Sequence, residues 1–145
     1  MIENVFIQGK PIPQGSVSPM PFRRKNGKMG VNVFQKPELL QWREKIAETV
    51  SQYKDSSDFY PKETPVMVFL SFRLLKPKSA KREQPCCKGL DLDKAVRAVL
   101  DALTGVTYDD DCQVCYIMTM KVYVPTEEQQ GVSITVKPYS FEERE

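Results

Sequence analysis

Apolar and polar positions alternate with a period of two in several stretches of the chain, which predicts β-strands. Strand-like runs occupy residues 4–9 and 65–75, and the second is rich in the β-branched and aromatic side chains of a buried strand. A short run at 31–34 is a further candidate strand. Residues 113–124 alternate clearly, and residues 131–138 are expected to turn back and pair with them as a hairpin.

Two other stretches repeat their apolar residues at helical spacing. The first covers residues 36–53, with Pro37 in the first turn, where a missing amide is tolerated. The second runs from Gly89 to Leu103, with Asp93 as the candidate N-cap. Its apolar stripe is made by Ala95, Val96, Val99, Leu100 and Leu103.

The order of these elements predicts one α+β domain over residues 1–145, with a mixed sheet and two main helices on one of its faces. Two connections are rich in Lys and Arg, and we expect basic loops at residues 10–30 and 76–89. Residues 138–145 are expected to form a frayed tail.

The composition limits the possible catalytic chemistry of the protein more than it limits the possible folds. The 145 residues suffice for one domain with a core, and no apolar run is long enough to span a bilayer. The N-terminus lacks the pattern of a signal peptide, so we expect a cytoplasmic protein. The chain has no histidine, which excludes Ser-His and Cys-His catalytic pairs. Catalysis would therefore depend on carboxylates, lysines or a metal ion.

Five aspartates are concentrated around the second helix. Asp91 and Asp93 lie at its start, and Asp109, Asp110 and Asp111 come directly before the alternating strand. One interpretation is a capped helix followed by an acidic turn, because acidic residues are common at helix starts. The other is a site for a hard divalent cation such as Mg²⁺, which prefers oxygen ligands. Beside two basic loops, such a site would suit a phosphodiester substrate.

Other metal sites fit the sequence less well. An EF-hand loop that starts at Asp91 would need Gly at position 96 and Glu at position 102, where the chain has valine and alanine. The four cysteines, Cys86, Cys87, Cys112 and Cys115, include one Cys-x-x-Cys spacing, but Cys115 falls within the alternating strand and no glycine shapes a zinc knuckle. We expect free thiols at these positions.

The stretch LDLDKAVRAVLDALTGVTYDDDCQV resembles the signature of RusA-type Holliday junction resolvases. That signature reads approximately Asp-x-Asp-Asn-Leu-x-Lys-x-x-x-Asp-Ala-Leu, followed by a short turn and Asp-Asp-Ser-Gln-Val. The stretch FIQGKPIPQGS and the strand MTMKVYV, with its embedded lysine, are similar to further parts of the family's pattern. The strong resemblance covers about a quarter of the chain.

The resemblance implies roles for individual residues. Asp91, Asp93 and Asp111 would be the essential acids, and together with Asp110 they would bind Mg²⁺, for which Mn²⁺ could substitute. Arg97 stands at the family's lysine position, where it keeps the charge for phosphate contact but cannot donate a proton near neutral pH. Supporting roles are implied for Asp101, Lys94 and Lys121.

The resemblance also implies a RusA-like fold and an endonuclease that acts as a homodimer on four-way DNA junctions, in recombination and repair. Two equivalent sites in a two-fold dimer would make paired symmetric nicks with 5′-phosphate ends, in a bacterial cell or a phage-infected host. No membrane partner and no small-molecule cofactor are expected. The residues expected to bind DNA are Arg23, Arg24, Lys25, Lys28, Lys76, Lys78, Lys81, Arg82 and Lys88.

The chain departs from the family's pattern at three positions. Lys94 stands in place of Asn, Gln14 in place of Lys, and Cys112 in place of Ser. Lys94 would compensate for the positive charge missing at position 14. Two alternatives remain open: a DNA- or RNA-binding module whose acids only shape the helix, and a resolvase homologue that has lost its activity.

Overall fold

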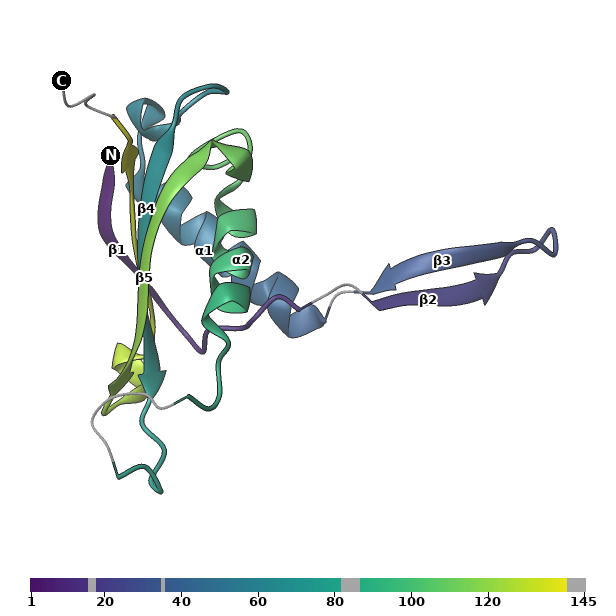
Figure 1. The fold of residues 1–145 in the computed structure, drawn as a ribbon, viewed down its shortest axis with the longest axis horizontal. Coiled ribbons are helices and arrows are strands. Elements are labelled where there is room, and N and C mark those ends of the chain that lie inside the picture. The colour runs from purple at the N-terminus through teal and green to yellow at the C-terminus, as the bar shows by residue number, and fades with distance from the viewer. Residues whose placement is uncertain (16–17, 35, 82–86, 141–145) are drawn as a thin grey trace.

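The computed structural model describes residues 1–15, 18–34, 36–81 and 87–140 of the chain (Figure 1). Its helices and strands are β1 (Ile2–Gln8), β2 (Ser18–Arg23), β3 (Met29–Phe34), α1 (Pro37–Tyr53), β4 (Val66–Leu75), α2 (Leu92–Leu103), β5 (Val114–Val124) and β6 (Gly131–Pro138). Short 3-10 helices lie in the connections at Ser56–Asp58, Asp111–Gln113 and Glu127–Gln129. No helix of the described residues is long and apolar enough to cross a membrane.

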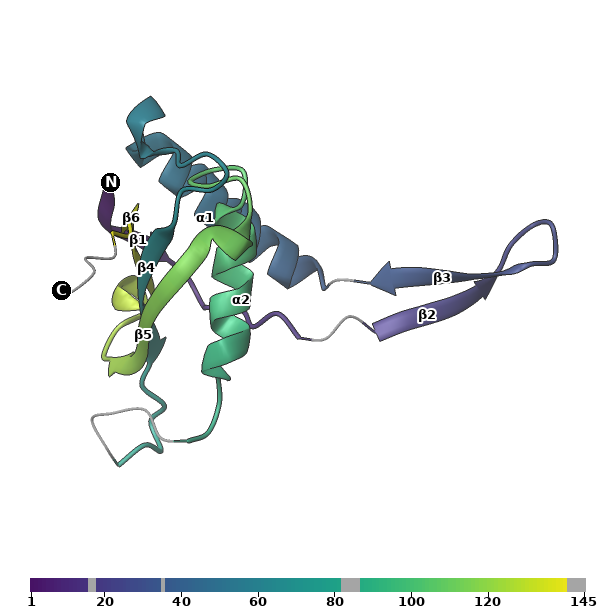
Figure 2. The same ribbon diagram turned by 45° about the horizontal axis from the view of Figure 1, so that its top comes forward.

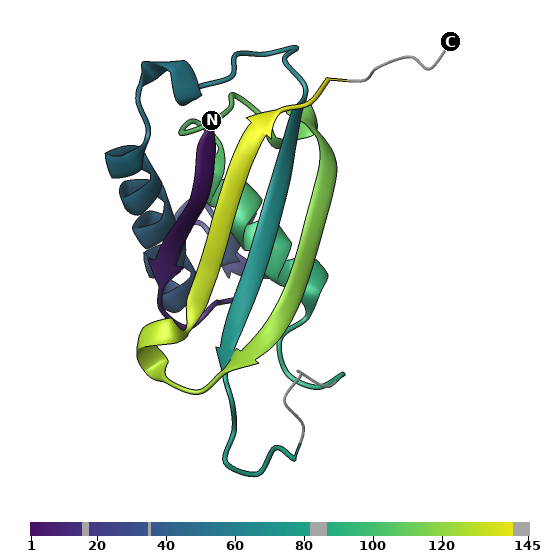
Figure 3. The ribbon, with the colours of Figure 1, turned by 90° about the vertical axis from the view of Figure 1, so that its left-hand side faces the viewer.

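Four of the described strands form a mixed sheet in the order β1-β6-β4-β5 (Figure 3). β1 and β4 run antiparallel to β6, whereas β4 and β5 are parallel and are connected through α2. The predicted hairpin between residues 113–124 and 131–138 is therefore wrong. β6 is buried along residues 131–136, which suits a central strand, and it lies between β1 and β4 instead of beside β5.

Both main helices cover the same face of this sheet (Figures 1 and 3). Buried side chains alternate along β4, from Val66 to Phe72, and join a core to which α1 contributes Ile46 and α2 contributes Val99 and Leu103. Burial of each such side chain stabilises the fold by about 1.5–3 kcal/mol. The predicted α+β fold, with a mixed sheet and two helices on one face, is confirmed.

Residues 18–34 form a two-stranded hairpin, here called the arm, that extends away from the sheet and helices (Figures 1 and 2). Its strands pair from Ser18↔Phe34 to Arg23↔Met29. The chain reverses between Arg24 and Lys28, where Gly27 has a φ of 82°. The predicted basic loop over residues 10–30 is thus wrong for β2 and the start of β3, because Asn-Gly between two extended segments favours a hairpin.

The two other irregular segments differ in how far the structure describes them. Residues 76–81 and 87–89 contain no helix or strand, as expected of the second basic loop, and the residues between them lie outside the described part of the chain. The start of the predicted tail is attached to the domain as far as Tyr139. The amide of Tyr139 donates to the carbonyl of Pro65, just before β4, over 2.9 Å. The tyrosine ring also stacks on Tyr116 of β5. Residues 141–145 lie outside the described residues.

Candidate active site

The first acidic group lies at the start of α2. Asp91 is the N-cap residue and Asp93 lies in the first turn, so the prediction that Asp93 caps the helix is wrong by two residues. The Asp91 carboxylate makes no capping hydrogen bond, and both aspartates are exposed. Their carboxylates are therefore free of the structural role that a capped-helix interpretation gives to such residues.

Two lysines make contacts at this end of the helix. The Lys94 ammonium lies 3.3 Å from an Asp91 carboxylate oxygen, in a solvent-exposed pair that contributes little to stability. The Lys121 ammonium, on β5, donates to the carbonyl of Leu90 over 2.8 Å. Lys121 thereby connects the residue before Asp91 to β5.

Asp93, Arg97 and Asp101 follow one another along the less buried face of α2, as their spacing predicts. Gln14 lies beside this face: its amide donates to the carbonyl of Lys94, and its side-chain nitrogen donates to Asp101 over 2.5 Å. The connection between β1 and the arm is therefore attached to the acidic helix.

The second acidic group is the turn before β5, which Gln113 organises. The buried side-chain oxygen of Gln113 accepts from the amides of Asp109 and Asp110 at 2.9 and 3.0 Å. Its side-chain nitrogen donates to the carbonyls of Tyr60, Pro61 and Thr64. Gln113 thus fixes the backbone of the aspartates to the segment that precedes β4.

Within this turn, Asp110 and Asp111 share a side-chain hydrogen bond, and their pKa values shift in opposite directions. The hydrogen bond from the amide of Cys112, followed by the one to Asp111, lowers the pKa of Asp110. Burial, the hydrogen bond to Asp110 and the nearby charge of Asp101 raise the pKa of Asp111. The negative charges of Asp101, Asp110 and Asp111 are therefore concentrated near the C-terminal end of α2.

The two acidic groups do not meet within one chain. Asp91 and Asp93 lie at one end of α2 and the Asp110–Asp111 pair lies by the other, and a helix of 12 residues is about 18 Å long. Ligands of one Mg²⁺ all lie about 2.1 Å from the ion. In agreement, no three Asp, Glu, Cys or His side chains of the described residues are grouped closely enough to hold a metal ion.

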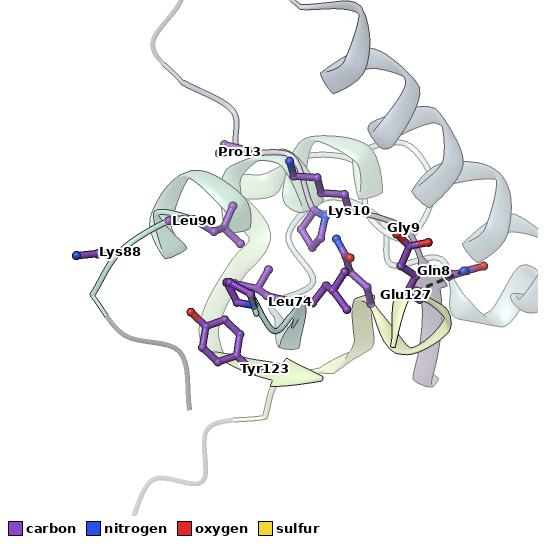
Figure 4. Close-up of a pocket in the computed structure, with 14 residues that line it drawn as sticks. Gln8, Gly9, Lys10, Pro13, Leu74, Lys88, Leu90, Tyr123 and Glu127 are labelled. Atoms are coloured by element: carbon purple, nitrogen blue, oxygen red, sulfur yellow. Dashed lines mark hydrogen bonds between the residues drawn. The ribbon is translucent and has the colours of Figure 1, made fainter. Parts of the chain in front are cut away.

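An open cavity of about 820 Å³ lies beside the start of α2 (Figure 4). Leu74 and Tyr123, from the ends of β4 and β5, line it together with Leu90. Lys10 and Lys88 add positive charge. The cavity thus provides cations and an apolar surface next to Asp91.

The predicted DNA-binding residues fall on two separate parts of the molecule. Arg23, Arg24, Lys25 and Lys28 are all exposed at the tip of the arm. Lys78, Lys81 and Lys88 are exposed in the second basic loop, which also contains Lys76, whereas Arg82 lies outside the described residues. Of the cysteines, Cys87, Cys112 and Cys115 are free thiols, and Cys86 lies outside the described residues.

Sequence analysis gave no role to Gln113, Lys10 or Tyr123. Gln113 lies inside the stretch that carries the family resemblance, so its position was a usable signal, but only the fold reveals its five hydrogen bonds. Lys10 and Tyr123 lie far apart in the sequence and meet only at the cavity.

Comparison with protein families gives a match that covers most of the chain. The model of the endodeoxyribonuclease RusA family matches residues 9–137, a range that holds all of α2, both acidic groups and the arm. No curated protein matches the chain. A match over most of the chain shows the family, and its endodeoxyribonuclease activity accords with the acids, the cations and the fold described above. The chain belongs to the RusA family of endodeoxyribonucleases.

Proposed function

We propose that this protein is a Mg²⁺-dependent endodeoxyribonuclease that resolves four-way DNA junctions by paired symmetric nicks, as a homodimer, in recombination and repair. The observation that carries the proposal is the match to the RusA family over residues 9–137. Asp91, Asp93 and Asp111 are the proposed essential acids, and Asp110 is a further metal ligand.

The donor set fits a hard divalent cation. The raised pKa of Asp111 reflects burial and the negative charge of Asp110 and Asp101, and a cation would relieve that repulsion. Asp91 and Asp93 offer exposed carboxylates that make no capping bond. When bound, Mg²⁺ or Mn²⁺ would polarise the phosphodiester and neutralise the charge that develops during hydrolysis.

The remaining residues would bind and orient the DNA. Arg97 lies between Asp93 and Asp101 on the less buried face of α2, where its permanent charge suits a phosphate. Lys10 and Lys88 line the cavity next to Asp91, where they suit a neighbouring phosphate. Lys121 would act indirectly, through its hydrogen bond to Leu90, by keeping Asp91 in place.

A homodimer would bring the two acidic groups together. β5 is an edge strand, and its side chains Tyr116, Ile117, Met118 and Met120 are 39–53% exposed. A long edge with apolar side chains is a surface that tends to pair with another strand. We therefore place the two-fold axis at β5, so that two copies of the strand pair antiparallel across it.

This pairing has a direct consequence for the acids. Antiparallel strands place the start of one β5 beside the end of the other. Asp111 begins the short 3-10 helix that leads into β5, and Lys121 near the end of the strand donates to Leu90, beside Asp91. Asp111 of the partner subunit would thus approach Asp91 and Asp93 of this one, which gives two equivalent sites for two symmetric nicks.

The two charge departures from the family lie side by side in the structure. Gln14 and Lys94 are joined by a backbone hydrogen bond of 3.0 Å, and their side chains reach Asp101 and Asp91. A positive charge missing at position 14 is therefore regained at a residue in direct contact with it. This arrangement supports retained activity over an inactive homologue.

The test is cleavage of a synthetic mobile four-way junction by the wild type and by Asp93→Asn, with and without Mg²⁺. We expect paired nicks from the wild type that require the metal and disappear in the variant, while junction binding persists. Binding by the wild type without nicks in Mg²⁺ or Mn²⁺ would contradict the proposal. It would instead favour the DNA-binding module or the inactive homologue.

A further inference from the structure

The arm, residues 18–34, is separated from the rest of the fold. Figures 1 and 2 show it projecting well beyond α1 and α2, and its two strands are paired with each other. At its base, Gln14 is bound to α2 and Pro37 begins α1. Both ends of the arm are therefore anchored on the helical face of the domain, while the tip is free to reach a partner.

The charge of this region is entirely positive. Residues 10–36 contain six of the 21 Lys and Arg residues and none of the 19 Asp and Glu residues of the chain. The rest of the chain keeps 15 basic against 19 acidic residues and is formally negative. Four of the six cations lie at the exposed tip, which indicates a polyanionic partner.

Two prolines make the β2 edge of the arm a poor template for another protein strand. Pro19 and Pro21 both lie in β2, two residues apart, so both lack an amide on the same edge of the strand. Within a hairpin, a proline fits only where its nitrogen points away from the partner strand. The outer edge of β2 is thereby short of hydrogen-bond donors, which opposes growth of the ribbon into a larger sheet on that side.

The dimensions of the arm suit duplex DNA. Paired strands lie about 4.8 Å apart, and the major groove of B-DNA, about 12 Å wide, admits a two-stranded ribbon with its side chains. Near the tip, the Phe22 ring packs closely on Gly30. Any other residue at this position would place its β-carbon only 2.6 Å from the ring. A small, isolated two-stranded hairpin is only marginally stable in water, so a partner along its length would stabilise it.

We propose that the arm is a DNA-binding ribbon that lies in the major groove of one duplex branch of the junction, with Arg23, Arg24, Lys25 and Lys28 on the phosphates that border the groove. The inference rests on the proposed function and deepens it. The arm would fix the branch while α2 and the acids meet the DNA near the crossover. Binding and hydrolysis are then carried by different parts of one chain.

The experiment compares two fourfold variants in binding to a four-way junction without divalent metal. The tip variant is Arg23→Gln, Arg24→Gln, Lys25→Gln and Lys28→Gln. The control variant removes the same charge from the body, with Lys45→Gln, Lys54→Gln, Lys62→Gln and Lys137→Gln. The slope of log K against log salt decreases in magnitude by about 0.9 for each phosphate that the protein no longer neutralises. We expect the slope to fall by roughly 7 in the tip variant, which lacks eight cations per proposed dimer, and by less than about 1 in the control.

Methylation by dimethyl sulfate then locates the groove. Guanine N7 lies in the major groove and adenine N3 in the minor groove. We expect the wild type to protect guanine N7 on two branches of the junction, one for each arm of the dimer, and the tip variant to lose that protection. Protection of adenine N3 instead, or equal salt slopes for the tip variant and the wild type, would overturn the inference.

The outcome separates the inference from the proposed function. If the wild type nicks junctions and the tip variant binds as the wild type does, only the role of the arm is wrong. If the wild type neither binds nor nicks junctions, both proposals are wrong. Circular dichroism and thermal unfolding of each variant establish that the fold is retained.

Discussion

Neighbouring aspartates in this protein have distinct roles because their local partners differ. Asp109 accepts a hydrogen bond from the amide of Lys62 at 2.9 Å, so its carboxylate is used in the structure. Asp110 caps the short 3-10 helix that follows it. Asp111 has the raised pKa and lies toward Asp101. Asp109 is thus used in the structure, Asp110 both caps a helix and is a proposed metal ligand, and Asp111 is the proposed essential acid of the three.

At this scale we predict that Asp111→Asn stabilises the metal-free protein and abolishes nicking. A carboxyl whose pKa is higher in the folded than in the unfolded state destabilises the fold at pH values above that pKa, and asparagine removes this repulsion. Thermal unfolding at pH 8 in EDTA should show a higher Tm than that of the wild type. Junction cleavage in Mg²⁺ should be lost.

The charge-matched control is Asp109→Asn. Its amide oxygen can still accept from Lys62, so Tm should change by less than about 1 °C and nicking should persist. A fall in Tm for Asp111→Asn would contradict the account of charge repulsion. Retained nicking would remove Asp111 from the essential acids.

At the scale of elements, α2 connects the chemistry with the fold. Its buried side, with Ala95, Val99 and Leu103, fixes the helix on the sheet, while its opposite side carries Asp93 and Arg97. The Lys121 ammonium donates to the carbonyl of Leu90, the residue directly before the N-cap Asp91. The position of the first acidic group therefore depends on a side chain of β5 as well as on the helix itself.

We predict that Lys121→Met loosens the start of α2 and slows nicking. Methionine keeps most of the aliphatic stem and removes the ammonium donor, at a loss of about 1–3 kcal/mol for a hydrogen bond to a charged group. Hydrogen exchange of peptides over residues 88–96 should become faster, while α1 stays protected.

Lys137→Met is the matched control for this change, since Lys137 lies over the Phe69 ring and away from Leu90. It should leave exchange at residues 88–96 unchanged. Unaltered exchange in Lys121→Met would show that the hydrogen bond to Leu90 does not hold the helix start.

At the scale of the whole molecule, the separation of the acids bears on the proposal that the protein acts as a homodimer. Asp91 and Asp93 lie about one helix length from Asp111, so a shared metal ion requires a second chain. β5 has an exposed edge that could provide the surface for it, and the proposed two-fold axis there would generate both sites at once. Under the proposed function, dimer formation and catalysis would thereby be coupled.

Mixing inactive subunits tests this coupling. Asp93→Asn and Asp111→Asn should each be inactive, but a heterodimer of the two keeps one complete site, made from the intact acids of both chains. With random exchange, half of the dimers are mixed and half of their sites are complete, so about a quarter of wild-type nicking should return, as single nicks.

The control mixture combines Asp91→Asn with Asp93→Asn. Both acids come from the same end of α2, so no heterodimer holds a complete site and nicking should stay absent. Inactivity of the first mixture, with heterodimers verified by two affinity tags, would contradict a site shared between subunits.

The sequence by itself determined the class of fold, the positions of α1, α2 and β4, and the residue types of the site. Periodicity of apolar residues records which side of an element is buried, and this information is local. The absence of histidine and the cluster of aspartates are likewise present in the chain before it folds. The family signature lies in one continuous stretch, which is why the family was evident.

Only the tertiary structure decided the neighbours of each element. β6 could have paired with β5 by proximity in sequence, but its burial on both faces places it between β1 and β4 and leaves β5 at the edge. The pairing of β2 with β3 depends on contacts that the basic composition of residues 10–30 concealed. Aspartates that are close in the sequence lie at opposite ends of α2, because a rigid helix separates residues that a flexible loop would allow to meet.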